Sequence, residues 1–144
     1  MQVRCFPAVT KEEMEACFAI RKQAFVEEQN VPADLEMDGQ DPAARHFGVM
    51  VDGNIIGTCR VRLMGSAAKI ERVAIIKEFR GKGVGQALMK YILNELGKNG
   101  DIELYKLSSQ SYAVPFYEKL GFRTRGPEFV EAGMPHYNMV LEKE

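Results

Sequence analysis

The chain has 144 residues, a formal net charge of −1, two histidines and three widely separated cysteines. This length predicts one domain over residues 1–144, with a core that needs no disulfide or metal. The charge excludes a general basic field for nucleic acid, and the histidines and cysteines form no metal-binding pattern. The sequence shows neither a signal-peptide layout nor an apolar run long enough to span a membrane, which indicates a cytosolic protein.

Hydrophobic periodicity and turn residues divide the chain into strands and helices. The expected strands, in chain order, cover residues 2–6, 47–51, 55–63, 69–76, 102–107, 122–125 and 137–141. The expected helices cover residues 10–28, 84–99 and 114–120. A helix between the strands at 69–76 and 102–107 implies a right-handed parallel crossover within a mixed sheet.

Local signals mark several ends of these elements. Thr10 and Glu13 have the spacing of a capping box, Asp52-Gly53-Asn54 predicts a tight hairpin, and Gly121 fits the position after a helix C-terminus. Simple alternation along the strand at 69–76 predicts two opposite faces. One face would carry Lys69, Glu71, Val73 and Ile75, and the other Ile70, Arg72, Ala74 and Ile76.

Charged residues in the first third of the chain have two interpretations each. Arg21 lies on the apolar face of the first helix, so its stem packs on the core with its head in water, or its head points into a cleft. Residues 30–45 read as an acidic loop containing Asp34, Glu36, Asp38 and Asp41. This loop is either simply solvated or an acidic rim that attracts a cationic substrate.

A glycine-rich stretch opens the long helix at residue 84. Arg80, Gly81, Lys82, Gly83 and Gly85 follow an apolar strand and allow the backbone to approach a ligand closely. Consecutive amides at a helix N-terminus bind phosphate oxygens, and the two basic side chains add positive charge. The spacing matches neither the dinucleotide fingerprint nor the Walker motif. The stretch therefore predicts a different kind of phosphate-binding loop, although a plain strand-to-helix turn remains the alternative.

Two motifs in order carry a family resemblance. Arg80-x-x-Gly83-x-Gly85 after a Val-Ala-Ile strand resembles the acetyl-coenzyme A motif of the GNAT superfamily of N-acetyltransferases. The stretch Ala-Val-Pro-Phe-Tyr-Glu-Lys-Leu-Gly-Phe at 113–122 resembles the second motif of that superfamily. Phe-Val-Glu-Glu-Gln at 25–29 and Ala-Gly-Met-Pro-His at 132–136 resemble a small bacterial branch of single-domain members.

The resemblance implies an α/β fold of GNAT type. It implies a mixed, mostly antiparallel sheet of six to seven strands, a splayed central parallel pair and about four helices on both faces. The implied activity moves an acetyl group from acetyl-CoA to a primary amine of a small molecule or peptide. Transfer would occur by direct attack in a ternary complex, in a monomer or homodimer, with no metal, nucleic acid or membrane partner.

The resemblance also implies which residues bind the coenzyme. Backbone groups of the strand around Val73 would pair with the pantetheine arm, and the glycine-rich amides would hold the pyrophosphate. Gln110 stands where many members have asparagine, and its side chain is one methylene longer for a bond to the pantetheine. The expected coenzyme-binding residues are Val73, Ala74, Ile75, Arg80, Gly81, Lys82, Gly83, Val84, Gly85, Gln110 and Phe116.

Two residues are expected to carry the proton transfers. Tyr117 matches the tyrosine that protonates the leaving thiolate in many members; otherwise it packs on the sheet beside Phe116. Glu71 is the candidate base, with a salt bridge to Lys69, Arg60 or Arg62 as its alternative role. His136, one of two histidines, lies near the expected acceptor cleft, where it either binds substrate, accepts a proton or is purely structural.

The acceptor is not defined by a family rule. The expected substrate-binding residues are Arg21, Phe25, Glu28, Gln29 and His136. The acidic loop favours a cationic amine, and a small amino-acid-like metabolite remains equally open. The rival interpretation is a non-catalytic module that binds acetyl-CoA as a sensor, because it would share the same phosphate loop.

Overall fold

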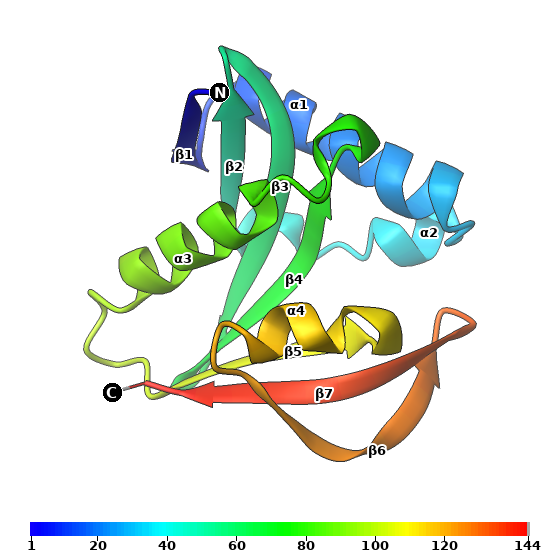
Figure 1. Cartoon of the computed structure of the whole chain (residues 1–144), viewed down its shortest axis with the longest axis vertical. Helices are drawn as coiled ribbons and strands as arrows, with labels where there is room; N and C mark the ends of the chain where they lie inside the picture. The colour runs from blue at the N-terminus through cyan, green and yellow to red at the C-terminus, as the bar shows by residue number, and fades with distance from the viewer. Residues whose placement is uncertain (144) are drawn as a thin grey trace.

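Seven strands form one mixed sheet in the order β1-β2-β3-β4-β5-β7-β6 (Figure 1). The computed structural model describes residues 1–143. The strands are β1 (Val3–Ala8), β2 (Arg45–Val51), β3 (Asn54–Met64), β4 (Ala67–Ile75), β5 (Leu104–Gln110), β6 (Arg123–Glu131) and β7 (Met134–Glu142). Neighbouring β4 and β5 run parallel, whereas the other adjacent pairs are antiparallel. This topology confirms the expected mixed sheet with a central parallel pair.

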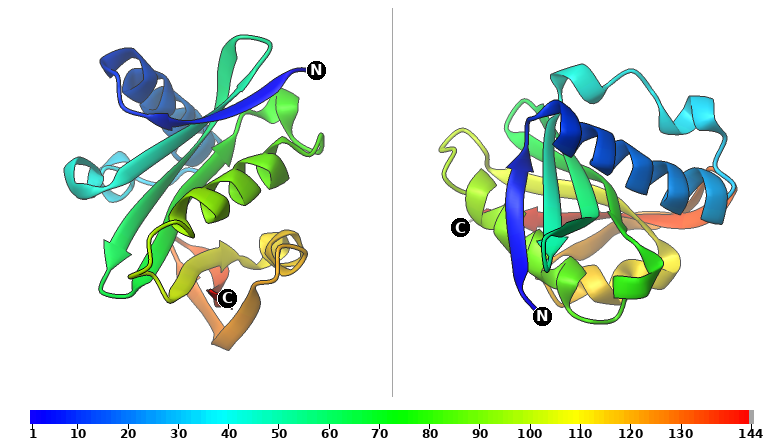
Figure 2. Two further views of the ribbon diagram at one scale, coloured as in Figure 1. Left: turned by 90° about the vertical axis from the view of Figure 1, so that its left-hand side faces the viewer. Right: turned by 90° about the horizontal axis from the view of Figure 1, so that it is seen from above.

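Helical segments cover the sheet from both sides (Figures 1 and 2). They are α1 (Lys11–Arg21), the π-helical η1 (Lys22–Glu28), α2 (Ala33–Glu36), η2 (Asp41–Ala43), η3 (Lys77–Phe79), α3 (Val84–Leu96), η4 (Ser111–Ala113) and α4 (Val114–Glu118). The apolar faces of α3 and α4 pack on one side of the sheet around the main core. On the other side, α1 packs against β1 to β4. Within residues 1–143, no helix combines the length and apolar composition needed to cross a bilayer.

Sequence signals at three turns have the expected structural effect. Thr10 and Glu13 form a complete capping box at the start of α1. Asp52 and Gly53 adopt φ values of +48° and +88° between β2 and β3, as a two-residue hairpin of type I′ requires. Gly121, with φ +100°, ends α4: its amide donates to the Glu118 carbonyl, and the following amide, that of Phe122, reaches back to Tyr117. This is the glycine-terminated C-cap that the sequence predicts.

The parallel pair at the centre of the sheet separates soon after it forms. β4 and β5 pair only at Ala67 with Leu104, Ala68 with Tyr105, and Lys69 with Lys106. Beyond Lys69 the two strands diverge, and a cavity opens between them. We call this space, between residues 70–73 of β4 and 107–110 of β5, the wedge. It matches the splayed central pair that the family resemblance implies.

Strand β4 also contains a bulge that the sequence did not reveal. Arg72 has φ +55°, and the register of β4 against β3 shifts beside it. Ile70 packs in the main core, whereas Ala74 packs against the α1 side. Val73 contacts the main core, while Glu71 forms ion pairs outside it. The predicted simple alternation, with Glu71 and Val73 on one face, is therefore wrong because the bulge exchanges the two faces.

Other differences concern the ends of elements. The expected first helix divides after Arg21 into α1 and η1, and the long helix α3 ends at Leu96. The acidic loop at 30–44 contains α2 and η2 in place of irregular chain. The short strands expected at 122–125 and 137–141 belong to one long hairpin, β6–β7, which turns at Ala132 and Gly133 with φ values of +51° and +76°.

Candidate active site

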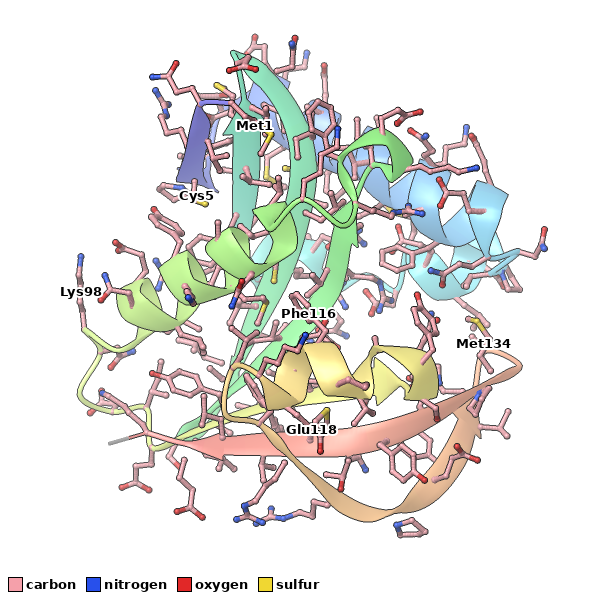
Figure 3. The ribbon with its side chains drawn as sticks, in the orientation of Figure 1. Met1, Cys5, Lys98, Phe116, Glu118 and Met134 are labelled. Atoms are coloured by element: carbon pink, nitrogen blue, oxygen red, sulfur yellow. The ribbon has the colours of Figure 1, made fainter. Side chains whose placement is uncertain are left out.

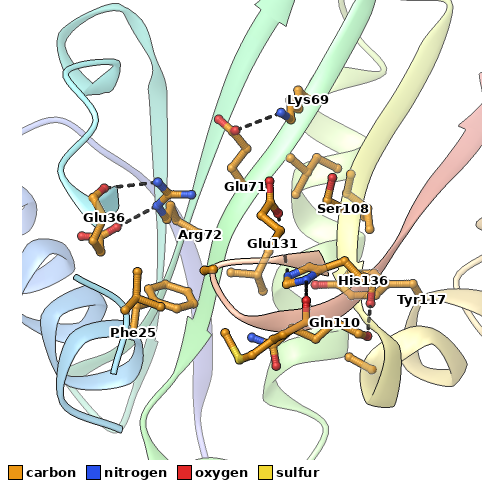
Figure 4. A pocket seen from close by; sticks show the side chains of 18 of the residues that line it. Phe25, Glu36, Lys69, Glu71, Arg72, Ser108, Gln110, Tyr117, Glu131 and His136 are labelled. Carbon is orange, nitrogen blue, oxygen red and sulfur yellow. Dashed lines mark hydrogen bonds and ion pairs between the residues drawn. The ribbon is translucent and has the colours of Figure 1, made fainter. Parts of the chain in front are cut away.

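The wedge holds a cavity of about 370 Å³ that joins several distant parts of the chain (Figure 4). Its walls come from η1, α2, β4, β5, the start of α4 and the β6–β7 turn. Four expected site residues line it: Phe25, Glu71, Tyr117 and His136. Val73 and Gln110 from the expected coenzyme site line it as well. A volume of this size is typical of small-molecule sites.

The glycine-rich loop has the geometry of an anion site at the N-terminus of α3. Gly81 and Gly83 adopt φ values of +75° and +82°, and a Cβ on either would meet nothing within 4 Å. Among the described residues, no carbonyl or side chain accepts a hydrogen bond from the amides of residues 81–85. These free amides at the positive end of a helix fit a pyrophosphate.

Gly85, at the start of α3, faces Phe116 of α4 and Ile75 of β4. A Cβ on Gly85 would lie 3.5 Å from the Phe116 ring and 3.7 Å from Ile75. Phe116 projects from α4 toward α3 (Figure 3), and a methyl group on Gly85 would fit against it at ordinary van der Waals distance. Phe116 and Gly85 thus form one wall beside the diverging strands.

Two pairs of predicted site residues contact one another. Arg80 donates from Nη2 to the Glu28 carboxylate at 2.7 Å and from Nε to the Ile75 carbonyl at 2.7 Å. Gln110 donates from its side-chain amide to Gln29 at 2.7 Å. The Ile75 carbonyl therefore already accepts one hydrogen bond, from Arg80. Both contacts attach the end of η1 to the coenzyme side of the wedge.

The end of α4 holds Tyr117 in place. Its ring packs edge-on against Phe116 and Phe122, with ring centroids 5.0 and 6.1 Å away. Burial raises the pKa of the Tyr117 phenol well above its ordinary value. The phenol is therefore fully protonated near neutral pH, and it lines the wedge. Both expected properties, packing beside Phe116 and access to the cavity, are present together.

Glu71 forms all the ion pairs that the sequence offered as its alternative role. Its carboxylate lies 2.6 Å from Arg62 Nε, 3.0 Å from Arg60 Nη2 and 3.4 Å from Lys69 Nζ. Burial raises the pKa of Glu71, but the hydrogen bond from Arg62 and the neighbouring charges outweigh it and hold the pKa below its ordinary value. Such a carboxylate is a weak proton acceptor.

The acidic loop is neutralised by buried arginines. Arg21, with 1% of its side chain exposed, contacts Glu36 at 2.9 Å and Asp41 at 2.7 Å. The expectation that its head lies in water or in the cleft is wrong, since the head is enclosed beneath the loop. Arg60, which is fully buried, contacts Asp38 at 2.8 Å. These pairs make the loop neither freely solvated nor an acidic rim.

Arg72 connects this loop to the wedge. Its Nε lies 2.7 Å from Glu36 (Figure 4), and its Nη2 lies 3.3 Å from Asp38. The left-handed backbone at Arg72 thus turns its guanidinium toward the loop. The ion pairs fix the loop at the rim of the cavity, where Leu35 and Glu36 form part of the lining.

His136 and Glu131 form a polar pair at the mouth of the cavity (Figure 4). The Nδ1–H of His136 donates to the Met134 carbonyl at 2.8 Å, because a carbonyl only accepts. Its Nε2 lies 3.8 Å from the Glu131 carboxylate, and its ring stacks on Phe129. The imidazole is thus fixed in one orientation with Nε2 on the side of Glu131.

Sequence reasoning missed several polar lining residues, among them Ser108, Tyr112 and Glu131. Ser108 alternates with Gln110 along β5, so the period of two along that strand was a usable signal. Glu131 precedes the tight turn of a hairpin whose first strand was expected to end at residue 125. No comparable signal marked Tyr112.

Comparison with known proteins agrees with this geometry. The family model for the acetyltransferase (GNAT) domain matches residues 5–143, and the chain belongs to this family of acyltransferases. The uncharacterised N-acetyltransferase YjcF of Bacillus subtilis strain 168 is 36% identical over 136 residues, covering 94% of this chain and 96% of YjcF.

Solved structures share the fold. A Lactobacillus plantarum protein superposes with a TM-score of 0.91 at 23% identity, covering 100% of both chains. A GNAT family acetyltransferase from Elizabethkingia anophelis, solved with acetyl-CoA bound, has a TM-score of 0.75 at 14% identity over 97% of each chain. Acetyl-CoA binding thus occurs on this fold, and this protein is an acetyl-CoA-dependent acetyltransferase of the GNAT family.

Proposed function

We propose that this enzyme transfers the acetyl group of acetyl-CoA to a primary amine of a small molecule or peptide, by direct attack in a ternary complex. The observation that carries this proposal is the wedge. A partly buried, protonated phenol and an oriented imidazole line this one cavity, and the free amides of residues 81–85 lie at the N-terminus of α3. A single connected space of this kind allows both substrates to meet without an acyl-enzyme.

The amides of residues 81–85 would hold the pyrophosphate of acetyl-CoA, and Arg80 would add charge beside them. The unpaired edge of β4 near Val73 would bind the extended arm, with Gln110 on the opposite strand. The bound coenzyme supplies an acyl thioester, which is an activated acetyl donor. A backbone N–H of β4 would stabilise negative charge on the acetyl oxygen during attack.

Tyr117 would donate a proton to the departing sulfur. Its raised pKa keeps the proton on the phenol until a stronger acceptor forms. A thiolate that forms in the same poorly solvated space also gains proton affinity, so the transfer remains favourable. Tyr117 therefore fits the role of general acid.

The proton of the attacking amine would pass to His136, directly or through water. Nε2 carries the lone pair, and Glu131 lies where it stabilises the imidazolium that results. The ion pairs of Glu71 favour a different role for that residue, which is to neutralise and anchor Arg60, Arg62 and Lys69.

The test measures free coenzyme A thiol released from acetyl-CoA against a panel of amines. Tyr117→Phe is expected to lower kcat by about 100-fold, the scale of general acid catalysis, with the acetyl-CoA affinity unchanged by calorimetry. Tyr91→Phe is the matched control. Tyr91, on α3, packs against Phe47 of β2 and does not line the wedge. Tight acetyl-CoA binding with no thiol release from any amine would instead support a non-catalytic sensor.

A further inference from the structure

A second cavity, of about 250 Å³, adjoins the wedge on the open face of β5, β7 and β6. Cross-strand register places Ser108, Asn138 and Arg125 in one row across these three strands. Lys106 pairs with Lys69 across β4 and β5, so both basic residues share the next row. All five side chains line this cavity, which we call the basic groove.

The basic groove carries uncompensated positive charge. Among the described residues, neither Lys106 nor Arg125 forms an ion pair with a carboxylate, and Lys69 reaches only Glu71, at 3.4 Å. Ser108 donates its hydroxyl hydrogen to Asn138 Oδ1 at 3.0 Å, which leaves the Asn138 amide N–H groups free to donate. This set of donors, with no acidic side chain in the lining, suits an anion.

The basic groove and the wedge are continuous. Lys69, Leu107 and Ser108 line both cavities. Gln110 and His136 form the neighbouring same-face row, two residues from the row of Ser108 and Asn138. At the rise of a strand, this separation is about 7 Å. A ligand whose amine lies beside His136 can therefore place a second group in the basic groove, if a short aliphatic chain joins the two groups.

We propose that the acceptor amine carries an anionic group, a carboxylate or phosphate, which binds Lys106, Arg125 and Asn138 in the basic groove. This inference rests on the proposed function and narrows its substrate class. It replaces the cationic acceptor that the acidic loop suggested, because Glu36, Asp38 and Asp41 are already paired with arginines. The open sheet face, which no helix among residues 1–143 covers, gives the anion access from solvent.

The experiment compares acceptors that differ only in the anionic group. δ-Aminovalerate is set against pentylamine, and O-phosphoethanolamine against ethanolamine, with thiol release as the readout. We expect the anionic member of at least one pair to have a kcat/KM at least about 10-fold higher, since charge-assisted contacts have that magnitude. The pair that shows the preference identifies carboxylate or phosphate.

Charge-removing variants locate the preference. Lys106→Gln and Arg125→Gln are expected to lower kcat/KM for the anionic acceptor by about 10-fold each, with little effect on its neutral counterpart and none on acetyl-CoA affinity. Lys98→Gln is the control, because Lys98 is exposed beyond the far end of α3 (Figure 3) and, within residues 1–143, its only ion pair is with Glu95. Equal preference for neutral and anionic acceptors, or variants that leave the ratio unchanged, overturns the proposal.

A binding measurement separates this inference from the proposed function. If no amine releases thiol, the proposed function is wrong, and titration with δ-aminovalerate and O-phosphoethanolamine still tests the groove. Amide NMR shifts at residues 106, 125 and 138 that disappear in Arg125→Gln would support an anion site there. No shift with either compound would overturn it.

Discussion

Replacing Glu71 with glutamine separates an anchoring role from a catalytic one. The carboxylate receives hydrogen bonds from Arg60 and Arg62 and neighbours Lys69, and 10% of it is exposed. Glutamine keeps the shape but loses the charge-assisted contacts. Arg60 keeps Asp38 and Asp41, so the expected loss is about 2 kcal/mol of unfolding free energy, the value of hydrogen bonds to charged groups. For a chain of this size, that corresponds to a Tm lower by about 7 °C.

Urea unfolding at pH 7 and pH 3, with steady-state turnover, checks this expectation. A lowered folded-state pKa means that Glu71 stabilises the fold above its unfolded pKa, about 4.3, and that this contribution is lost as the pH falls through the folded value. The difference between wild type and Glu71→Gln should therefore shrink at pH 3. Turnover should fall by less than about 10-fold. A loss of 100-fold or more with an unchanged Tm would refute the anchoring role and make Glu71 the base.

Two further predictions concern the glycine-rich loop and the cysteines. Gly83→Ala places a side chain at φ +82° and is expected to cost about 1 kcal/mol by urea unfolding. It should also weaken acetyl-CoA binding in calorimetry, and equal affinity and stability would contradict the role of the left-handed turn. Cys17 and Cys59 are fully buried, and burial raises the pKa of both thiols, so neither should react with a thiol reagent until the protein unfolds. Half-buried Cys5 should account for any slow native reaction, and rapid labelling of Cys59 would show that β3 opens readily.

Local signals predicted the parts of the fold that short-range chemistry determines. Thr10 and Glu13 satisfy one another within one turn, and Gly53 supplies a backbone conformation that few residues adopt. The first family motif predicted the phosphate loop, and the second predicted the short helix that follows the next strand. These features depend on residues close in sequence, so their patterns remain readable.

Long-range contacts determine the features that the sequence did not predict. The bulge at Arg72 accompanies ion pairs with Glu36 and Asp38, more than thirty positions earlier in the chain. A strict period of two along β4 gives no sign of it, and the error carried over to the face assigned to Glu71. In the same way, Arg21 and Asp41 were interpreted separately, each as facing solvent or substrate. In the structure they form an ion pair and neutralise one another.

The site itself was predicted in part. Tyr117, Val73 and Gln110 were found because the family motifs mark them, and the structure places all three at the wedge. Several residues of the basic groove lie on β5 and β6, and the strands expected there ended too early in the sequence. Arg125 stood at the end of the expected strand at 122–125, and Lys106 showed no pattern without the register of β5 against its neighbours.

The early separation of β4 from β5 gives this sheet an edge in its interior. Backbone groups without a neighbouring strand usually lie at the border of a sheet, where they offer a template to other chains. Here they lie inside the wedge, next to α4 and η1 and away from the border of the sheet. The protein can therefore keep a set of unpaired peptide groups ready for a slender ligand without the risk of aggregation that an open border strand carries.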